Sequence, residues 1–345
     1  MTKQAEIPGS LLSLYPLIEF EVMSMRKGRF APTPSGLMHI GNMCAALLSW
    51  LDIRSSGGIY VLRMEDIDLA RCRPEYAEKI LDDLRWLGID WDEGPDVGGP
   101  YTPYTQSERL SGYEEALQQL TRAGRVYPCY CSRAILQAIA SAPHGLGSEG
   151  PVYPGTCRHL SEEERRRRMQ LKTPAMRFML SDSAHSWIDG VLGPQHIPVG
   201  YGGDFVIKRA DGMFAYQLAV VVDDAAMGIT HVMRGADLLD STARQLELYE
   251  ALGLAAPHYA HLPLLHLDGE KMSKRHAHGP TSIPEMRRAG VRAEALVGWI
   301  AYLYGLLDAP EPVKASELIA EYSISKLPRE RIAVPSDMLQ RLYAP

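Results

Sequence analysis

Residues 29–42 read Arg29-Phe30-Ala31-Pro32-Thr33-Pro34-Ser35-Gly36-Leu37-Met38-His39-Ile40-Gly41-Asn42, and this stretch predicts a strand and a turn that lead into a helix. The two prolines stiffen the turn, and Gly36 and Gly41 leave the backbone open to the close approach of a ligand. A helix that begins near Gly41 points its N-terminal amide groups at an anion. His39 is placed to donate a hydrogen bond to a phosphate, although a histidine at a helix start is more often a plain cap.

The second informative stretch is Lys271-Met272-Ser273-Lys274-Arg275, which follows an apolar run at residues 261–265 and a turn. We expect Lys271 and Lys274 to contact a leaving phosphate group from a loop, with Ser273 adding a hydroxyl donor. Lysines at this spacing, taken alone, are more often part of a solvated surface. Phosphoryl and nucleotidyl transfer depend on positioning and on positive charge more than on covalent help from the protein. Together, and in this order, the two stretches resemble the two ATP-binding signatures of the class I aminoacyl-tRNA synthetases, which implies a nucleotide-dependent reaction.

The composition is that of an ordinary globular protein with a mildly negative charge. The chain has 345 residues and a formal net charge of −6 at pH 7. Such a length is typical of about two or three domains. The negative total does not exclude an RNA partner, because phosphate binding needs only a local basic stripe. No apolar run approaches the ~20 residues of a membrane helix, so we expect no membrane partner. Separately, we expect the protein to be a monomer.

Cysteine usage and the first residues bear on where the protein works. The chain has 5 cysteines, an odd number. Without an export signal, this usage favours a reducing cytoplasm over a disulfide framework. Residues 1–24 contain a short apolar run but lack a basic leader and a clear cleavage site. We expect this segment to be a disordered N-terminal extension, with Met23 or Met25 as an alternative start.

Alternating apolar segments predict an α/β architecture with a parallel sheet. Strands are expected at residues 29–32 and 59–64, and helices at 41–56 and 74–87, an order that favours helices on the faces of a parallel sheet. Further elements are expected as follows: helices at 107–123, 241–252 and 283–307, a strand at 260–266, and a hairpin in which a turn at 210–212 joins runs 204–209 and 214–224. The charge block 161–168 is more typical of a solvated helix than of an RNA contact.

A metal site is predicted from the spacing Cys129-Tyr130-Cys131 and Tyr153-Pro154-Gly155-Thr156-Cys157. Three thiols and the phenol oxygen of Tyr153 form a tetrahedral set suited to zinc. A metal would also order the Gly- and Pro-rich loop that precedes Cys157. The alternatives are a redox pair or unrelated buried thiols, and His159 is a less favoured fourth ligand. Cys44 and Cys72 are expected to be structural.

Four further segments, at residues 29–32, 63–68, 215–224 and 234–238, resemble the glutamate-activating branch of the class I aminoacyl-tRNA synthetases. The resemblance covers roughly residues 28–307, and Asn42 departs from the family signature. It implies that a carboxylate attacks the α-phosphate of ATP, bound with Mg²⁺, and that pyrophosphate leaves. The implied ATP-binding residues are His39, Gly41, Asn42, Lys271, Ser273 and Lys274, of which His39, Lys271 and Lys274 are the implied catalytic residues.

The same resemblance implies a glutamate pocket formed by Arg29, Phe30, Ala31, Pro32, Thr33, Glu65, Tyr216 and Arg234. The two arginines suit carboxylates, because a guanidinium binds a carboxylate through two parallel hydrogen bonds. Glu65 is expected to hold the α-ammonium group and Tyr216 to wall the pocket. On pattern alone, Glu65 is equally readable as a surface carboxylate and Tyr216 as an aromatic residue of a buried strand.

The resemblance also implies a division of the chain. The expected parts are an extension at 1–24, the first half of a Rossmann-like catalytic domain at 25–104, an inserted zinc-containing, acceptor-like module at 105–203, the second half with the lysine loop at 204–282, and a short helical region at 283–345.

The cysteine spacing is similar to that of a shortened paralogue of the glutamyl-tRNA synthetases, which attaches glutamate to queuosine in the anticodon loop of tRNA(Asp). We therefore expect glutamate activation without tRNA, and tRNA(Asp) carrying queuosine as the partner. The alternatives are a truncated glutamyl-tRNA synthetase that charges tRNA(Glu), a non-catalytic paralogue that binds tRNA or glutamate, and a small-molecule nucleotidyltransferase. The segment 276–345 looks too short for a large helical anticodon-binding domain, which argues against the first.

Overall fold

The computed structural model describes residues 25–132, 153–267, 269–271 and 281–343. The predictions for residues 1–24, for the loop 133–152 and for Ser273 and Lys274 lie outside the described residues. Among the described helices, none combines the length and the apolar character that a membrane crossing requires.

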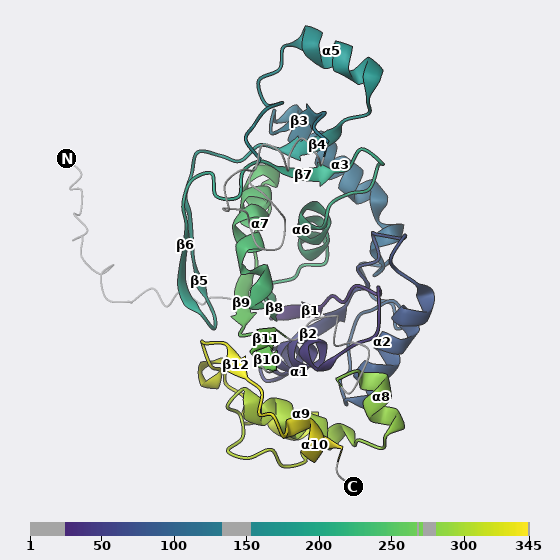
Figure 1. Cartoon of the computed structure of the whole chain (residues 1–345), viewed down its shortest axis with the longest axis vertical. Helices are drawn as coiled ribbons and strands as arrows, with labels where there is room; N and C mark the ends of the chain where they lie inside the picture. Colours follow the sequence, from purple (N-terminus) through teal and green to yellow (C-terminus); the bar gives the residue numbers. More distant parts are fainter. Residues whose placement is uncertain (1–24, 133–152, 268, 272–280, 344–345) are drawn as a thin grey trace, which may run out of the picture.

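The centre of the molecule is a parallel sheet of four strands in the order β2-β1-β8-β9 (Figure 1). Its strands are β1 (Lys27–Phe30), β2 (Ile59–Leu62), β8 (His231–Gly235) and β9 (His258–Leu262). The register pairs Gly28 with Tyr60 on one side and with His231 on the other. A side chain at Gly28 would collide with Ile53 of α1 (Ile40–Arg54), so glycine lets this helix lie close to the sheet. The predicted parallel sheet is confirmed.

Helices cover the sheet and continue beyond both of its ends (Figure 1). The described helices are α1, α2 (Pro74–Trp86), α3 (Leu110–Arg122), α5 (Glu162–Leu171), α6 (Tyr216–Ala226), α7 (Leu239–Leu252), α8 (Ile283–Arg288), α9 (Ala293–Leu303) and α10 (Met338–Leu342), with 3-10 turns η1 (Gln106–Glu108), η2 (Ala236–Leu238), η4 (Ala315–Leu318) and η5 (Ile324–Lys326). The largest apolar core joins α1 to the sheet and to the C-terminal helices.

The segment between α3 and α6 forms two further sheets. An antiparallel sheet has the order β3-β4-β7, and a separate hairpin is formed by β5 and β6. Their bounds are β3 (Val126–Cys129), β4 (Ala175–Phe178), β5 (His185–Asp189), β6 (Gly193–Ile197) and β7 (Phe205–Lys208). Below the central sheet, β10 (Leu265–Leu267) pairs with β11 (Glu270–Lys271) and with β12 (Ile332–Ala333).

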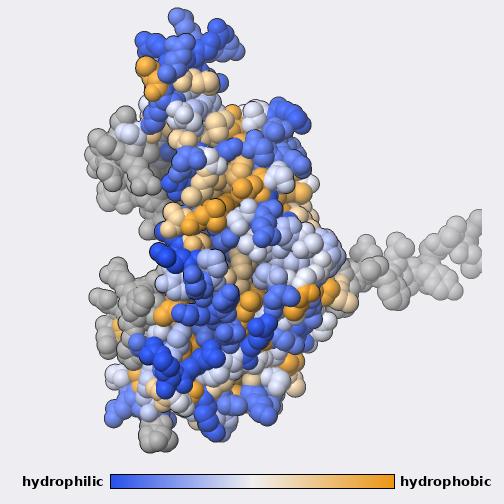
Figure 2. Space-filling model, turned by 90° about the vertical axis from the view of Figure 1, so that its right-hand side faces the viewer, coloured by the Kyte–Doolittle hydropathy of each residue, from blue (hydrophilic) through white to orange (hydrophobic). Residues whose placement is uncertain are grey.

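The charge block forms a solvated helix, as predicted. Helix α5 has no buried residue, and Ser161 caps it by accepting a hydrogen bond from the backbone of Glu164. Figure 2 shows the top of the molecule, where α5 lies, as a largely hydrophilic surface with a small hydrophobic patch, and Met169 and Leu171 of this helix are exposed. Its first turn is acidic and its last turn is basic, which suits the helix dipole.

The hairpin predicted over residues 204–224 is wrong in its second half. β7 and an isolated bridge between Lys208 and Phe214 are present, but the chain then enters α6. The β-branched residues of this run cost a helix at most about 0.7 kcal/mol each. Burial of Leu218 and Val221 and the ion pairs of Asp224 in the helical spacing outweigh that cost.

The single helix predicted over residues 283–307 is also wrong, because the structure divides it into α8 and α9. Gly290 lies between them with a φ of +83°, a left-handed conformation that ends α8 and that glycine adopts at little cost. The break lets both helices pack against the core through Met286 and Ile300, which are fully buried.

A buried cluster of charged side chains joins the sheet to α6. The guanidinium of Arg63 is 0% exposed and donates to Asp224 at 2.7 Å and to Glu65 at 3.0 Å. Asp224 also accepts from Nε of Arg29 at 3.2 Å. The neighbouring Asp223 lies 3.7 Å from Nε of Arg63. With Arg109, which pairs with Asp223, three guanidinium groups face three carboxylates, and burial of ionised groups requires such pairing.

Asp223 offers a test of how much this cluster stabilises the fold. Its carboxylate is 0% exposed and accepts from Nε of Arg109 at 2.6 Å and from the hydroxyl of Tyr113 at 2.8 Å. Asp223→Asn removes the charge and turns an amide donor toward other donors. Loss of one partner of a buried ion pair costs about 3–5 kcal/mol. We expect the free energy of unfolding, measured in urea, to fall by about this amount.

The matched control is Asp82→Asn on α2, the same change at an exposed ion pair. Asp82 lies 3.9 Å from Arg85, and its side chain is 66% exposed. We expect no measurable change in stability, because exposed pairs of this kind contribute little. Equal effects of the two substitutions would contradict a special role for the buried cluster.

Candidate active site

A cavity of about 600 Å³ opens at the carboxyl ends of β1, β8 and β9. Ligands of open parallel sheets bind at this edge. The wall contains Phe30 at the end of β1 and Ala31 after it, Gly235 at the end of β8 and Pro263 after β9. The predicted residues found in this wall are Arg29, Phe30, Ala31, Pro32, Thr33, His39, Gly41, Asn42, Glu65, Tyr216 and Arg234. One cavity therefore brings together all the residues predicted to bind the amino acid and three of the six predicted to bind ATP, His39, Gly41 and Asn42.

The chain that follows the lysine loop packs against the start of α1, beside this cavity. The backbone amide of Ile40 donates to the carbonyl of Thr281 at 3.2 Å, and Ile283 donates to Met38 at 3.1 Å. These bonds pair the His39 turn with the chain that follows the lysine loop. Lys271, which precedes that loop, pairs through its backbone with His266. Residues 281–283 thus lie at the start of α1, and Lys271 belongs to a strand pair with β10, whose Leu265 lines the cavity.

Residues 39–42 form the N-terminal cap of α1. The backbone amide of His39 donates to Oδ1 of Asn42 at 3.1 Å, which leaves the Nδ2 amide of Asn42 as the group able to donate to a phosphate. Asn42 is thus the third residue of a capping box whose N-cap is His39. A Cβ at Gly41 would lie 2.9 Å from Cε1 of His39, so glycine lets the imidazole fold against the helix start.

The acidic groups near the cavity differ in their electrostatics. Burial raises the pKa of the Glu65 carboxyl, although the charges of Arg63 and Arg29 oppose the rise. Burial also tends to raise the pKa of Asp224, but the positive charges of Arg29 and Arg63 have the larger effect and bring this pKa below its usual value. Asp224 is therefore the fixed counter-ion, whereas Glu65 lines the cavity.

Tyr216 on α6 and Arg234 on β8 both line the cavity. Tyr216 is the first residue of α6, so it does not belong to a strand. Burial raises the pKa of its phenol, which keeps the hydroxyl protonated and able to donate a hydrogen bond. Arg234, on β8, is 5% exposed, and its Nη1 has no hydrogen-bond partner in the described structure. An unpartnered buried guanidinium nitrogen in a cavity wall is suited to an incoming carboxylate.

Sequence reasoning missed the side chains that support this wall. Arg63 and Asp224 fix Arg29 and Glu65 through ion pairs, and Asp237 lines the cavity itself. The available signal was the pair Asp223-Asp224 within an apolar run, because carboxylates in such a run need buried partners.

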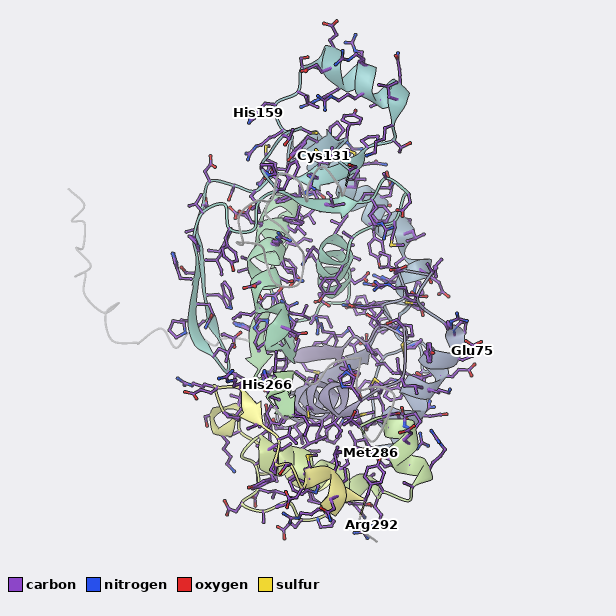
Figure 3. All side chains as sticks on the ribbon, in the orientation of Figure 1. Glu75, Cys131, His159, His266, Met286 and Arg292 are labelled. Carbon is purple, nitrogen blue, oxygen red and sulfur yellow. The ribbon has the colours of Figure 1, made fainter. Side chains whose placement is uncertain are left out.

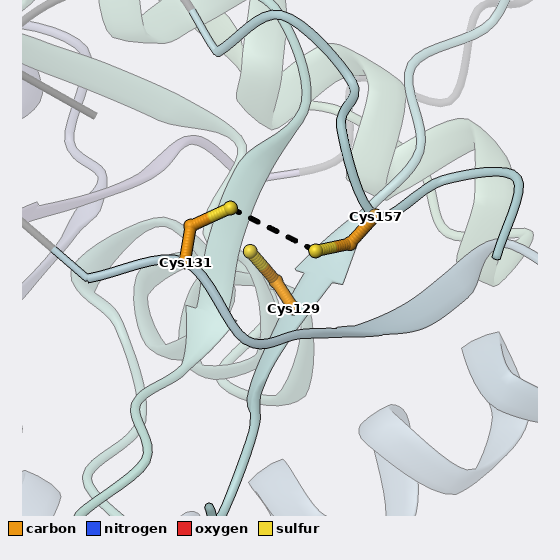
Figure 4. Close-up of side chains that lie close together, drawn as sticks. All are labelled: Cys129, Cys131 and Cys157. Atoms are coloured by element: carbon orange, nitrogen blue, oxygen red, sulfur yellow. Dashed lines mark hydrogen bonds between the residues drawn. The ribbon is translucent and has the colours of Figure 1, made fainter. Parts of the chain in front are cut away.

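A second candidate site is a cluster of three thiols. The Sγ atoms of Cys129, Cys131 and Cys157 all lie within 4.8 Å of one another (Figure 4). The Sγ atoms of Cys131 and Cys157 are 3.7 Å apart. The hydroxyl oxygen of Tyr153 lies 3.5 Å from Sγ of Cys129 and 3.9 Å from Sγ of Cys131. Thiolates around a tetrahedral zinc are separated by about 3.8 Å, since each Zn–S bond is about 2.3 Å. The predicted four residues are thus adjacent, with a spacing that fits zinc.

The thiol cluster lies far from the cavity. Figure 3 shows Cys131 in the upper part of the molecule and His266, on β10, in the lower part. His159 is exposed and is not a member of the thiol group. Cys44 is buried in α1, and Cys72 is partly buried. The arrangement suits a structural role for a bound metal and separates that role from chemistry in the cavity.

Comparisons with known proteins give a consistent result. The family model for the catalytic domain of class I tRNA synthetases (E and Q) matches residues 26–338. A protein of Symbiobacterium thermophilum named glutamyl-Q tRNA(Asp) synthetase is 58% identical over 91% of this chain and 98% of its own length. A protein of Nitratidesulfovibrio vulgaris with the same name is 50% identical, over 92% of this chain and 98% of its own.

The fold is similar to that of a solved relative. The crystal structure of a glutamate-tRNA synthetase from Elizabethkingia anophelis superposes with a TM-score of 0.81 and is 30% identical in sequence. The match covers 92% of this chain and 70% of that chain.

Proposed function

This chain belongs to the class I tRNA synthetases for glutamate and glutamine, and on that premise we propose that it activates L-glutamate with ATP and transfers it to queuosine in the anticodon loop of tRNA(Asp). The family makes it a ligase of the aminoacyl-tRNA synthetase type. The observation that carries the choice of substrate is the buried, cationic cavity wall formed by Arg29 and Arg234 with Glu65 beside them. A reducing cytoplasm, where tRNA is found, is the proposed location.

The first step joins glutamate to the nucleotide. A carboxylate oxygen of glutamate attacks the α-phosphorus of ATP, the bond to the β-phosphate breaks, and pyrophosphate leaves with Mg²⁺. Arg234 binds a carboxylate of the amino acid, and Glu65 accepts from its ammonium group. His39, the Asn42 amide and the α1 amides bind phosphate oxygens, where negative charge increases in the transition state.

The second step transfers glutamate to the acceptor. A hydroxyl group of queuosine attacks the activated carbonyl, and AMP leaves. The choice of acceptor is supported by the relative named glutamyl-Q tRNA(Asp) synthetase, which this chain matches at 58% identity over 98% of that relative's length. We propose that activation needs no tRNA, because ion pairs within the chain already hold Arg29 and Glu65 in the cavity wall.

The proposed cofactor is a structural zinc ion held by Cys129, Cys131, Tyr153 and Cys157. The donor set and its spacing support this choice. Bound zinc would cross-link β3 to the segment that precedes α5 and would supply folding energy there. We propose that residues 105–203 form an inserted module between the two halves of the catalytic domain.

The acceptor is tested with radiolabelled glutamate. Purified enzyme is incubated with ATP and with tRNA(Asp) that carries queuosine, tRNA(Asp) that lacks it, or tRNA(Glu). We expect label only on tRNA(Asp) with queuosine, because the modified base supplies the attacking hydroxyl. Label on tRNA(Glu) would indicate a charging enzyme, and label on both forms of tRNA(Asp) would exclude queuosine as the acceptor.

The catalytic lysine is tested by Lys274→Ala. Loss of one donor that contacts transition-state charge typically slows a reaction about 10²–10³-fold. We expect the rate of ATP–pyrophosphate exchange to fall by this factor, with a smaller change in KM for glutamate. Lys326→Ala is the control, because Lys326 is exposed and its amino group contacts only a backbone carbonyl. Unchanged exchange in the Lys274 variant would remove this residue from the mechanism.

The zinc site is tested by metal analysis of purified protein. We expect about one zinc per chain, as in other closed structural sites, and loss of zinc in Cys157→Ser. Cys72→Ser is the control, because Cys72 is not a member of the thiol group. Wild-type protein without zinc, or a Cys157 variant that retains it, would contradict this assignment.

A further inference from the structure

A chain of buried polar side chains leads from the β5–β6 hairpin to the wall of the cavity. Oδ2 of Asp189 lies 2.5 Å from Nδ1 of His261, and Nε of Arg234 donates to Nε2 of His261 at 3.0 Å. Asp189 is 2% exposed, His261 is 0% exposed and Arg234 is 5% exposed. These three residues are far apart in sequence, and no motif of the chain connects them.

The hydrogen bonds fix the position of each proton in this chain. A guanidinium only donates, so Nε2 of His261 accepts and the imidazole proton lies on Nδ1, which donates to Asp189. Burial lowers the pKa of His261 to about 4, although the hydrogen bond to Asp189 opposes this effect. The imidazole is therefore neutral near pH 7, in the tautomer that Arg234 needs.

Asp189 is held in place by the backbone. Its Oδ1 accepts from the amides of Val191, Leu192 and His261 at 3.1, 2.9 and 3.0 Å. Burial tends to raise the pKa of this carboxyl, but these bonds and His261 bring it below its usual value. Asp189 is thus an ionised acceptor with a fixed orientation.

Arg234 is consequently held at two of its three nitrogens. Nε donates to His261, and Nη2 donates to the hydroxyl of Thr242 at 2.9 Å. Nη1 has no partner in the described structure, and Arg234 lines the cavity. We infer that Asp189 and His261 are positioning residues that hold the guanidinium of Arg234 so that Nη1 is available to a carboxylate of the substrate. This inference rests on the proposed function and names two further residues that determine affinity for glutamate.

The hairpin also connects the segment between α3 and α6 to the amino-acid site. The turn after Asp189 reaches β9, where the amide of Gly190 donates to the carbonyl of Tyr259 at 2.8 Å. A Cβ at Gly190 would lie 3.2 Å from Cβ of Ala260, so the contact is tight. Figure 1 shows β5 and β6 running alongside α7 down to the central sheet.

Two substitutions of His261 separate its two hydrogen bonds. The side-chain oxygen of His261→Gln takes the place of Nε2 and accepts from Arg234. The side-chain amide of His261→Asn takes the place of Nδ1 and donates to Asp189, but leaves Nε of Arg234 without an acceptor. The readouts are KM and kcat for glutamate and for ATP in pyrophosphate exchange, with the thermal midpoint as a measure of folding.

We expect His261→Asn to raise KM for glutamate by about 10-fold or more, as for a lost hydrogen bond to a charged group. His261→Gln should change it by less than about 3-fold, and KM for ATP should stay constant in both. Asp189→Asn should raise KM for glutamate by a similar factor. The side-chain amide of this variant can donate to Nδ1 of His261, which favours a proton on Nε2, and Nε2 then no longer accepts from Arg234. If Asn is tolerated as well as Gln, or if both raise KM for ATP equally, the inference is overturned.

A second measurement applies to wild-type protein and does not depend on its substrate. The ¹⁵N NMR signal of the His261 imidazole, assigned by its loss in His261→Gln, should show a neutral ring with the proton on Nδ1 at pH 7. A charged ring or a proton on Nε2 would overturn the inference. If wild-type protein fails to activate glutamate while the tautomer is as expected, the proposed function fails and the positioning of Arg234 stands.

Discussion

The guanidinium of Arg63 has no exposed surface, and the arrangement of the active site depends on the carboxylates that balance it. Asp224 from α6 and Glu65 after β2 bind it directly, and Asp224 binds Arg29 as well. Removing one partner of such a cluster lowers the stability of the fold, because it leaves a buried charge unpaired. The cluster therefore holds α6 against the carboxyl ends of β1 and β2. Two residues of the cavity wall, Arg29 and Glu65, are therefore oriented before any substrate binds.

The two arginines expected to bind glutamate differ in how much charge they offer. Arg29 already has Asp224 as a counter-ion, with both side chains buried. Arg234 is bound by a neutral imidazole and a hydroxyl, and no carboxylate of the described residues pairs with it. The charge of Arg234 is thus the less compensated of the two, which favours it as the main attraction for a substrate carboxylate.

Local sequence was sufficient to predict the strand, turn and helix start at residues 29–42 and the proximity of the three cysteines. The turn at residues 31–42, the cap at His39 and the cysteine spacing depend on short segments with strong backbone preferences. The helix at α6 and the position of Asp189 were not predictable in this way. Helix α6 is stabilised by the ion pairs of Asp224 with Arg29 on β1 and Arg63 after β2. Asp189 contacts His261 only because the β5–β6 hairpin packs against β9. The alternation and the turn glycine around Gly193 signal that hairpin, but not its destination.

We propose that this cavity activates glutamate without tRNA. ATP–pyrophosphate exchange by the purified protein, run with each amino acid and with and without tRNA, tests this proposal. We expect exchange with glutamate in the absence of tRNA and little with glutamine or aspartate, because a neutral amide loses the charge-assisted bond to Arg234 and a shorter side chain does not reach it. Preferential exchange with glutamine, or exchange with glutamate only when tRNA is added, would contradict it.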